Sequence, residues 1–426
     1  MNSHDRVWQS LNHQEPDHVP FDLGGTGLST IHVTAYQNLR RHLSLPAIEP
    51  RIAFKAEQLV RVDEDLAERL QTDVRPVLPG MASGFEYVLR DDGVYEAYTD
   101  EWGIGWRKPK DGGFYYDMFH HPLATANSLE ELRAYALPDP LDGGRFATLR
   151  SQAEAAVSKG MAVALAGPCA GIAEVYSWLR GFEQYYMDLA INQAYVAYML
   201  DRMVEWKCAF WQRALGEIGD WVDVVIEADD LGGQNAPLMS PDTYCDLIQP
   251  RHKRLFAFIK AQAPVKLFYH TCGAVRPLIP ALIDAGIDIL NPVQISATGM
   301  DLHELKREFG RELVFWGGGV DTQRVLGVAE PEQIREHVRR NIEALAPGGG
   351  LVFAAVHDIQ ANVPPENIMA MWEAWRTCGG KRLVVEAGEE QTPRPGEMRN
   401  SICDIGGTHA NDEGPGIPGY WQDRAG

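Results

Sequence analysis

From about residue 145 onward, short apolar runs alternate with longer stretches of helical periodicity. Each run ends at glycine, proline or a polar side chain, which is typical of a buried strand. Strands that are separated by helices pair in parallel. Six runs follow this pattern, at Met161–Ala166, Trp221–Ala228, Val265–Tyr269, Gly286–Leu290, Leu313–Trp316 and Leu351–Val356.

Two earlier segments, Val19–Leu23 and a short run near Val74–Val77, raise the count of strands to eight. Eight parallel strands close into a barrel, so the sequence predicts an α/β fold, a (β/α)8 TIM barrel over residues 1–380. A doubly wound open sheet is the alternative. No Gly-x-Gly-x-x-Gly motif follows the first strand, however, so a dinucleotide site is not indicated.

Residues 85–119 show a pattern of polar and apolar positions that differs from the rest of the chain. Phe85–Leu89 and Val94–Tyr98 both alternate in polarity, and Asp92-Gly93 between them is a hairpin turn signal. We therefore expect a β-hairpin insertion. Aromatic residues follow it closely and form either a satellite core under the hairpin or a wall for substrate; they are Trp102, Trp106, Tyr115, Tyr116 and Phe119.

The C-terminal residues 386–426 are rich in glycine, proline and acidic residues and poor in apolar ones. This composition predicts a tail that is flexible or draped over the surface.

Composition excludes several classes of function. The formal net charge of -20, with no basic stripe to offset it, disfavours nucleic acid. The six cysteines include no Cys-x-x-Cys pair, which favours reduced thiols and a cytoplasmic protein over a disulfide framework. The N-terminus lacks the apolar core of a secretion signal, and no run approaches the ~20 apolar residues that span a bilayer.

The candidate chemistry begins at His270-Thr271-Cys272, where the apolar run Val265–Tyr269 ends. Side chains two residues apart on a strand leave on the same face, so an imidazole and a thiol point to one place. An isolated pair of this kind is more often packed in a core than bound to metal. His357 ends the last predicted strand, and a barrel brings all such ends to one mouth. His270, Cys272 and His357 are therefore predicted to bind zinc, with one coordination position open.

Other polar side chains also stand at strand ends. Asp229 and Asp230 are adjacent, so one of them is expected to face the mouth, as a general base, as a partner to a zinc-bound His or in hydroxyl recognition. A helix cap or a loop hydrogen bond is the alternative. Glu227 is a candidate for the fourth zinc position. Candidates for positioning substrate or cofactor are Asn291, Asp321 and Gln323.

Several longer motifs surround these candidates. Asp229-Asp230-Leu231-Gly232-Gly233-Gln234, His270-Thr271-Cys272-Gly273, Asn291-Pro292-Val293-Gln294, Trp316-Gly317-Gly318-Gly319-Val320-Asp321-Thr322-Gln323 and His357-Asp358-Ile359-Gln360 occur in this order, followed by Pro364-Pro365-Glu366-Asn367. As a set, they resemble the uroporphyrinogen decarboxylase superfamily, specifically its zinc-dependent corrinoid methyltransferase branch. The resemblance extends over about residues 1–380 and implies a (β/α)8 barrel with zinc on the His-x-Cys pair and on a third ligand at the last strand.

In the thiol methyltransferases of that branch, the resemblance implies a cysteine as third ligand, shortly before a Pro-x-Glu-Asn motif. Here His357 stands at the same offset from Pro364. The expected function is therefore methyl transfer from a methoxylated or other small methylated substrate to a corrinoid on a partner protein (O-demethylation). Alternatives are methyl transfer to a thiol or folate, uroporphyrinogen decarboxylation and a non-catalytic corrinoid-binding barrel. The resemblance also allows a homodimer.

Overall fold

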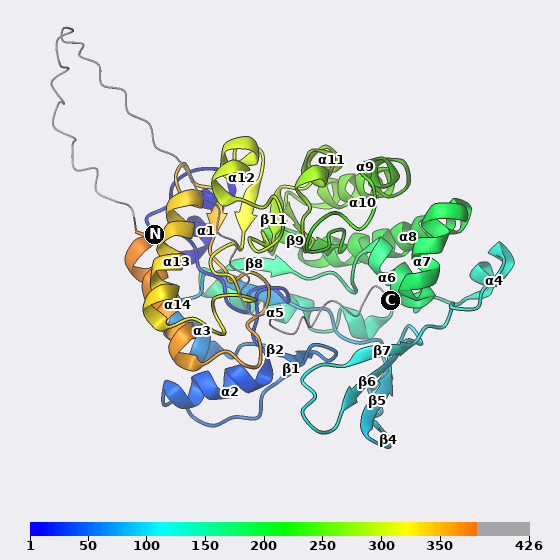
Figure 1. Cartoon of the computed structure of the whole chain (residues 1–426), viewed down its shortest axis with the longest axis horizontal. Helices are drawn as coiled ribbons and strands as arrows, with labels where there is room; N and C mark the ends of the chain where they lie inside the picture. The colour runs from blue at the N-terminus through cyan, green and yellow to red at the C-terminus, as the bar shows by residue number, and fades with distance from the viewer. Residues whose placement is uncertain (381–426) are drawn as a thin grey trace, which may run out of the picture. The chain divides into compact units, whose positions relative to one another are not determined.

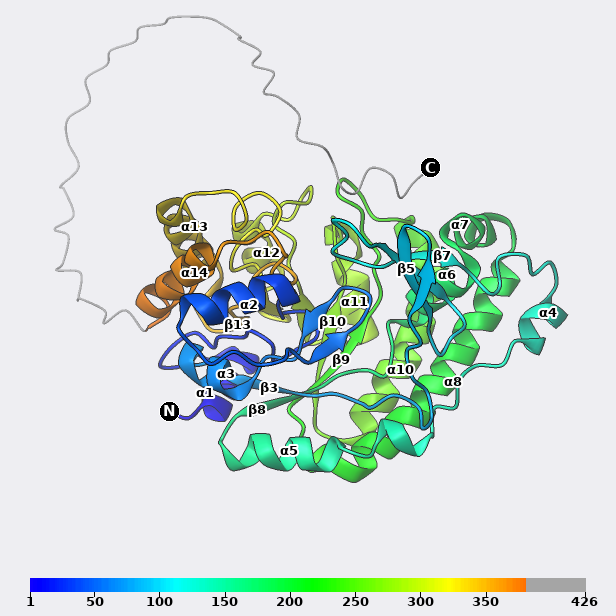
Figure 2. The same cartoon turned by 90° about the horizontal axis from the view of Figure 1, so that it is seen from below.

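The computed structural model describes residues 1–380, which are built around one parallel sheet (Figures 1 and 2). Seven strands pair in the order β13-β12-β11-β10-β9-β8-β3. Their bounds are β3 Val74–Val77, β8 Ala162–Leu165, β9 Val224–Ala228, β10 Lys266–His270, β11 Ile289–Asn291, β12 Val314–Trp316 and β13 Leu351–Val352. Each lies within or next to a run that the sequence marks as a strand.

The segment around Phe21 closes this sheet on itself. Phe21 forms a parallel bridge with Phe353, just beyond β13. There the Phe353 amide donates to the Pro20 carbonyl at 2.8 Å, and the Asp22 amide donates back to the Phe353 carbonyl at 2.9 Å. On its other side, the Asp73 amide donates to the Phe21 carbonyl at 2.8 Å. The predicted first strand thus occupies the eighth position, and the predicted (β/α)8 barrel is confirmed.

Alternate residues of the strands fill the interior of the barrel, as the two-residue period of a strand requires. Helix α1 (Ser3–Leu11) packs against β3, β8 and β13 and adds two apolar side chains to this core. The inner cluster consists of Val7, Leu11, Val74, Ala162, Ala164, Val224, Ile226, Phe268, Ile289, Val314, Trp316, Val352 and Ala354. The barrel is therefore a packed core, with its polar groups at the strand ends.

Helices cover the outside of the barrel (Figure 1). Ser240 begins one of them as sequence rules expect, because its hydroxyl accepts a hydrogen bond from the Thr243 amide at 3.1 Å. The bounds are α2 Val33–His42, α3 Glu64–Leu70, α4 Leu129–Ala134, α5 Leu149–Ser158, α6 Ile172–Arg180, α7 Phe182–Ile191, α8 Gln193–Ile218, α9 Pro241–Thr243, α10 Gln249–Gln262, α11 Ile279–Ala285, α12 Leu302–Phe309, α13 Pro331–Leu345 and α14 Pro365–Cys378.

The insertion holds more strands than the hairpin that the sequence predicts. It is a four-stranded antiparallel sheet of β4 (Arg90–Asp92), β5 (Tyr95–Thr99), β6 (Gly105–Pro109) and β7 (Asp117–His120). The turn falls where predicted, but Phe85–Leu89 forms no strand, because its alternating pattern finds no neighbouring strand to pair with. A separate pair, β1 (Ile52–Phe54) and β2 (Leu59–Val60), lies between α2 and α3.

The buried aromatic residues of the insertion join the main core, where Trp102 packs against Trp206 of α8 and Trp106 against Trp178 of α6. Trp102 and Trp106 are each 7% exposed and Tyr116 is 3% exposed, whereas Phe119 is 40% exposed. The Trp106 indole donates to the Asp100 carboxylate at 2.8 Å, so its polar edge is satisfied under the sheet.

The predicted tail, residues 386–426, lies outside the described residues. Among residues 1–380, no helix is both long enough and apolar enough to cross a bilayer.

Barrel closure depends on the buried carboxylate of Asp73. One of its oxygens accepts the Phe21 amide at 2.9 Å and the other accepts Arg6 at 2.6 Å, with the side chain 1% exposed. We expect Asp73→Ala to lower the free energy of unfolding by about 2–4 kcal/mol, because the buried Phe21 amide and the partly buried Arg6 lose their shared acceptor. Urea denaturation followed by fluorescence measures this loss.

Asp17→Ala is the matched control, because Asp17 pairs with the same Arg6 at 2.8 Å from a side chain that is 42% exposed. Its cost should be about 0–1 kcal/mol. Equal losses for the two variants would contradict the assignment of Asp73 to closure.

Candidate metal centre

His270, Cys272 and His357 come together at the carboxyl ends of the strands. Each offers one ligand atom, and the three atoms all lie within 4.8 Å of one another. His270 Nε2 lies 3.3 Å from Cys272 Sγ. The His270 side chain is 5% exposed and that of His357 is 36% exposed. The cluster is thus anchored on the buried side and open toward the mouth.

Two neighbouring side chains hold the imidazoles in place. Asn291 Oδ1 lies 2.5 Å from His270 Nδ1, and the amide of Asn291 donates in turn to the Trp316 carbonyl at 2.8 Å. His357 Nδ1 accepts the Asp358 amide at 2.8 Å and lies 3.1 Å from the Asp358 carboxylate. Both rings therefore leave Nε2 free for a ligand, the arrangement that metal-binding histidines adopt.

Glycines allow the loops that carry the cluster to touch. A Cβ on Gly273 would stand 2.3 Å from the Gly232 carbonyl oxygen, and Gly273 has φ +88°. The Ala274 amide donates to the Gly233 carbonyl at 2.8 Å. These contacts join the loop after β9 to the loop after β10, which brings Asp230 next to Cys272.

The electrostatic environment disfavours a free thiolate. Burial, aided by the negative charge of Asp230, raises the pKa of the Cys272 thiol to about 12. Burial lowers the pKa of His270 against the pull of Asp230, so this imidazole is neutral and ready to bind. For His357, burial opposes the charged form, but Asp358 and Cys272 together outweigh it and raise the pKa well above its usual value.

Asp229 and Asp230 point in opposite directions. Val224 and Ile226 of β9 face the barrel interior, and the alternation carries Asp230 to the same side. Asp230 Oδ1 accepts the Cys272 amide at 2.9 Å and lies 3.7 Å from His270 Nε2. Asp230 is therefore the carboxylate of the pair that faces the cluster.

Asp229 is fully buried and faces the helices. One of its oxygens accepts the Glu174 amide at 2.6 Å in the first turn of α6, and the other lies 2.7 Å from His252 Nε2. These are the cap and loop contacts that the alternative interpretation of the sequence describes.

Glu227 also faces the helices, since it shares the parity of Asp229. Its carboxylate contacts Lys207 Nζ at 2.7 Å and the Trp211 indole at 2.6 Å, in a pair with almost no exposed surface. Both oxygens are engaged there, so the structure does not bring Glu227 to the fourth zinc position.

The other candidates lie around the cluster in different ways. Asn291 is buried and occupied by His270, as described above. Asp321 Oδ1 accepts the amides of Gln323 and Arg324, at 2.8 and 3.1 Å, and so caps its own turn. Gln323 is exposed and accepts the Ser296 hydroxyl at 2.8 Å. Of these three, only Gln323 presents its side chain at the surface.

Sequence reasoning missed Glu174, which follows the N-cap of α6 and lies beside the two aspartates. Burial, then the charges of Asp230 and Asp229, raise the pKa of its carboxyl well above the usual value. Burial and these two negative charges therefore favour the protonated form of Glu174. The sequence holds no signal for this role, because Glu174 is in a helix and not at a strand end.

Comparison with known proteins agrees with this architecture. The sequence model of the family described as "Uroporphyrinogen decarboxylase (URO-D)" matches residues 118–378, more than half of the chain. The chain belongs to the uroporphyrinogen decarboxylase family. The His-x-Cys pair and His357 both lie within the matched region of this family. No curated protein matches the chain.

Among solved structures, a methyltransferase from Methanosarcina mazei is similar at a TM-score of 0.61 and 18% identity, over 88% of this chain and 99% of that one. At this identity, the likeness shows the fold. A xylanase from Penicillium canescens gives a TM-score of 0.35 at 13% identity, over 58% of this chain and 84% of that one. This likeness is too low to indicate a shared function.

The opposite orientations of the two aspartates make a testable contrast. We expect Asp229→Ala to lower the free energy of unfolding by about 2–4 kcal/mol, because the α6 cap and His252 lose a buried acceptor. Asp230→Ala should cost about 1 kcal/mol or less, since its side chain is 42% exposed. Urea denaturation of both variants measures the difference, and a larger loss for Asp230→Ala would contradict the assignment.

Proposed function

We propose that this protein is a zinc-dependent methyltransferase. It would move a methyl group from a methoxylated or other small methylated compound to a corrinoid cofactor held by a partner protein. The observation that carries the proposal is the convergence of one thiol and two imidazoles within 4.8 Å. Three protein ligands with an open side are the usual donor set of catalytic zinc.

His270, Cys272 and His357 would hold the ion, and Asn291 and Asp358 would fix the two rings. One thiolate and two neutral imidazoles leave a divalent ion with a net positive charge, whereas a second thiolate would cancel it. Bound zinc supplies Lewis-acid polarisation of an ether or alcohol oxygen. The histidine at position 357 therefore favours an oxygen-linked methyl donor over a thiol.

The reaction needs a proton as well as a methyl acceptor. The bond between the methyl carbon and oxygen breaks, the methyl group passes to the reduced corrinoid, and the oxygen keeps the electron pair and takes up a proton. Burial and the charges of Asp230 and Asp229 favour the protonated form of Glu174, and this residue would supply the proton. Asp230, next to the Cys272 amide, would accept a hydrogen bond from a hydroxyl group of the substrate near the cluster.

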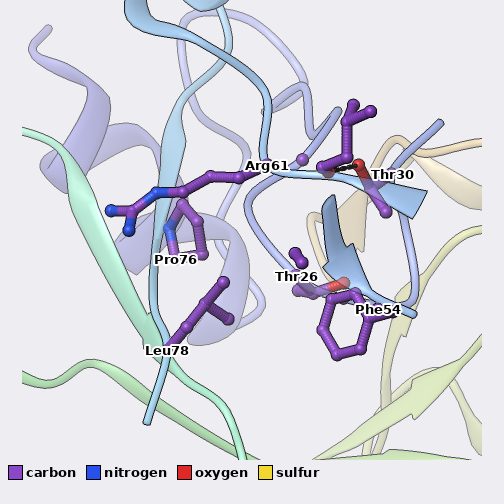
Figure 3. Close-up of a pocket in the computed structure, with 10 residues that line it drawn as sticks. Thr26, Thr30, Phe54, Arg61, Pro76 and Leu78 are labelled. Atoms are coloured by element: carbon purple, nitrogen blue, oxygen red, sulfur yellow. Dashed lines mark hydrogen bonds between the residues drawn. The ribbon is translucent and has the colours of Figure 1, made fainter. Parts of the chain in front are cut away.

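The uroporphyrinogen decarboxylase pattern has arginines near the N-terminus that hold propionate groups, and their absence from residues 22–27 of this chain argues against decarboxylation. Here Asp22 takes that place and accepts hydrogen bonds from the Gly25 amide at 2.7 Å and the Trp316 indole at 2.8 Å. The neighbouring cavity is about 10 Å³, room for one water molecule (Figure 3). Phe54 and the stem of Arg61 line it, so it leaves no room for a tetrapyrrole side chain.

The decisive measurements are metal content and methyl transfer. We expect one zinc per chain, with X-ray absorption showing one sulfur and at least two nitrogen or oxygen neighbours. Removing zinc should abolish demethylation of a panel of methoxylated compounds by cob(I)alamin, and restoring zinc should recover it. Cys272→Ser should lower both zinc content and rate, and Asn291→Ala should weaken zinc binding about 10–100-fold by releasing His270.

Cys208→Ser is the matched control, because Cys208 lies within α8, away from the cluster. It should keep full zinc content and activity. A chain that binds no zinc, or porphyrinogen decarboxylation that survives chelation, would overturn the proposal. Two sulfur neighbours would remove His357 from the ligand set. Zinc binding with transfer to a thiol or folate, and none to a corrinoid, would change the acceptor.

A further inference from the structure

Residues 86–94 form a continuous exposed stretch on the insertion. It includes several apolar side chains that a monomer would ordinarily shield: Tyr87 is 37%, Leu89 46% and Val88 69% exposed. Contiguous exposed apolar residues of this kind mark interaction surfaces. The same residues carry the alternating pattern from which the sequence predicts a strand.

Part of the backbone of this stretch is also without partners. Among residues 1–380, β4 pairs with β5 on one side only, so its other edge is open there, and it is the outermost strand of the insertion (Figure 1). Residues 86–89 make no backbone hydrogen bond within the described part of the chain. An open edge that continues into an unpaired segment of strand-forming residues is a template for a further strand.

The charges of the segment match those of a second copy. If two copies run antiparallel with Val88 opposite Val88, then Glu86 faces Arg90 of the other copy, twice, and Tyr87 faces Leu89, twice. The Glu86 carboxylate has no ion pair in residues 1–380, and Arg90 bonds only to the Thr99 hydroxyl at 2.9 Å. Asp91 and Asp92 then lie opposite Phe85 and Gly84, so no like charges meet.

A shift of this register by one residue on each chain removes the match. With Leu89 opposite Leu89, Glu86 would face Asp92 of the other copy, and like charges directly opposite are destabilising. In the register centred on Val88, the side chains also divide between the two faces of the sheet. Glu86, Val88 and Arg90 lie on one face, while Tyr87 and Leu89 lie on the other, where Tyr87 already packs 5.0 Å from the Tyr98 ring.

We propose that two copies of this chain associate through antiparallel pairing of residues 86–90 about a two-fold axis at Val88. The pairing joins two four-stranded sheets into one of eight strands and covers the exposed apolar side chains. A five-residue edge buries less surface than a permanent dimer needs, so the dimer forms and dissociates with protein concentration. This inference is independent of the proposed function, because the edge lies outside the metal centre.

Sedimentation velocity of the full chain, at ionic strength about 0.15 M so that long-range repulsion between acidic copies is screened, tests the pairing. We expect the wild type to shift from monomer to dimer with rising concentration. Glu86→Arg and Arg90→Glu should each weaken association at least about tenfold, because each places like charges opposite each other twice. The double variant, with both substitutions, should restore association to near the wild-type level.

Val94→Lys is the control, because Val94 is 73% exposed on the same sheet but falls outside the paired segment. It should dimerise as the wild type does, whereas Val88→Lys should not. Circular dichroism checks that each exposed substitution leaves the fold intact. A wild type that stays monomeric, a dimer that Glu86→Arg leaves unchanged, or a double variant that fails to recover would each overturn the proposal.

Discussion

The hydrogen bonds that seat Phe21 between Phe353 and Asp73 are the constraint on which the rest of the structure depends. Without them the seven strands would form an open sheet, with β13 at one edge and β3 at the other. Closure places the loop after β13 at the same mouth as the loops after β9 and β10. His357 meets His270 only because the sheet closes, so the metal centre is a consequence of backbone pairing far from it in sequence.

The two-residue period of the strands then decides which side chains reach the mouth. On β9 it turns Asp230 inward and sends Glu227 and Asp229 to the helices, where each forms hydrogen bonds with buried partners. The chain thus places three carboxylates within four residues and uses them for two different tasks. The buried pair of Glu227 with Lys207 supports the wall of the barrel, and Asp230 remains available to the cluster.

The sequence predicts these outcomes unevenly, for physical reasons. Apolar runs and their polar ends identify the strands and the convergence of His270, Cys272 and His357, because both depend on local periodicity. The two aspartates cannot be told apart by residue type, since their difference arises from where β9 begins its alternation. Glu174 is missed for a related reason: its proton depends on charges from another strand. The extra strands of the insertion are missed because β6 and β7 carry charged and turn residues that hide the alternation.

The position of His357, the proposed third ligand, connects the fold to the candidate metal centre. Asp358, the next residue, is 2% exposed and holds the imidazole at Nδ1, while its other oxygen accepts the Thr30 amide at 2.8 Å from the loop after the closing segment. A cysteine at position 357 would have no such second contact, and its thiolate would add a charge beside Asp230. The imidazole of His357 keeps the site less negative than a thiolate would, although the Asp358 carboxylate lies beside it. The loop after the segment that closes the barrel therefore also helps to hold the residue that would set the charge of the proposed metal centre.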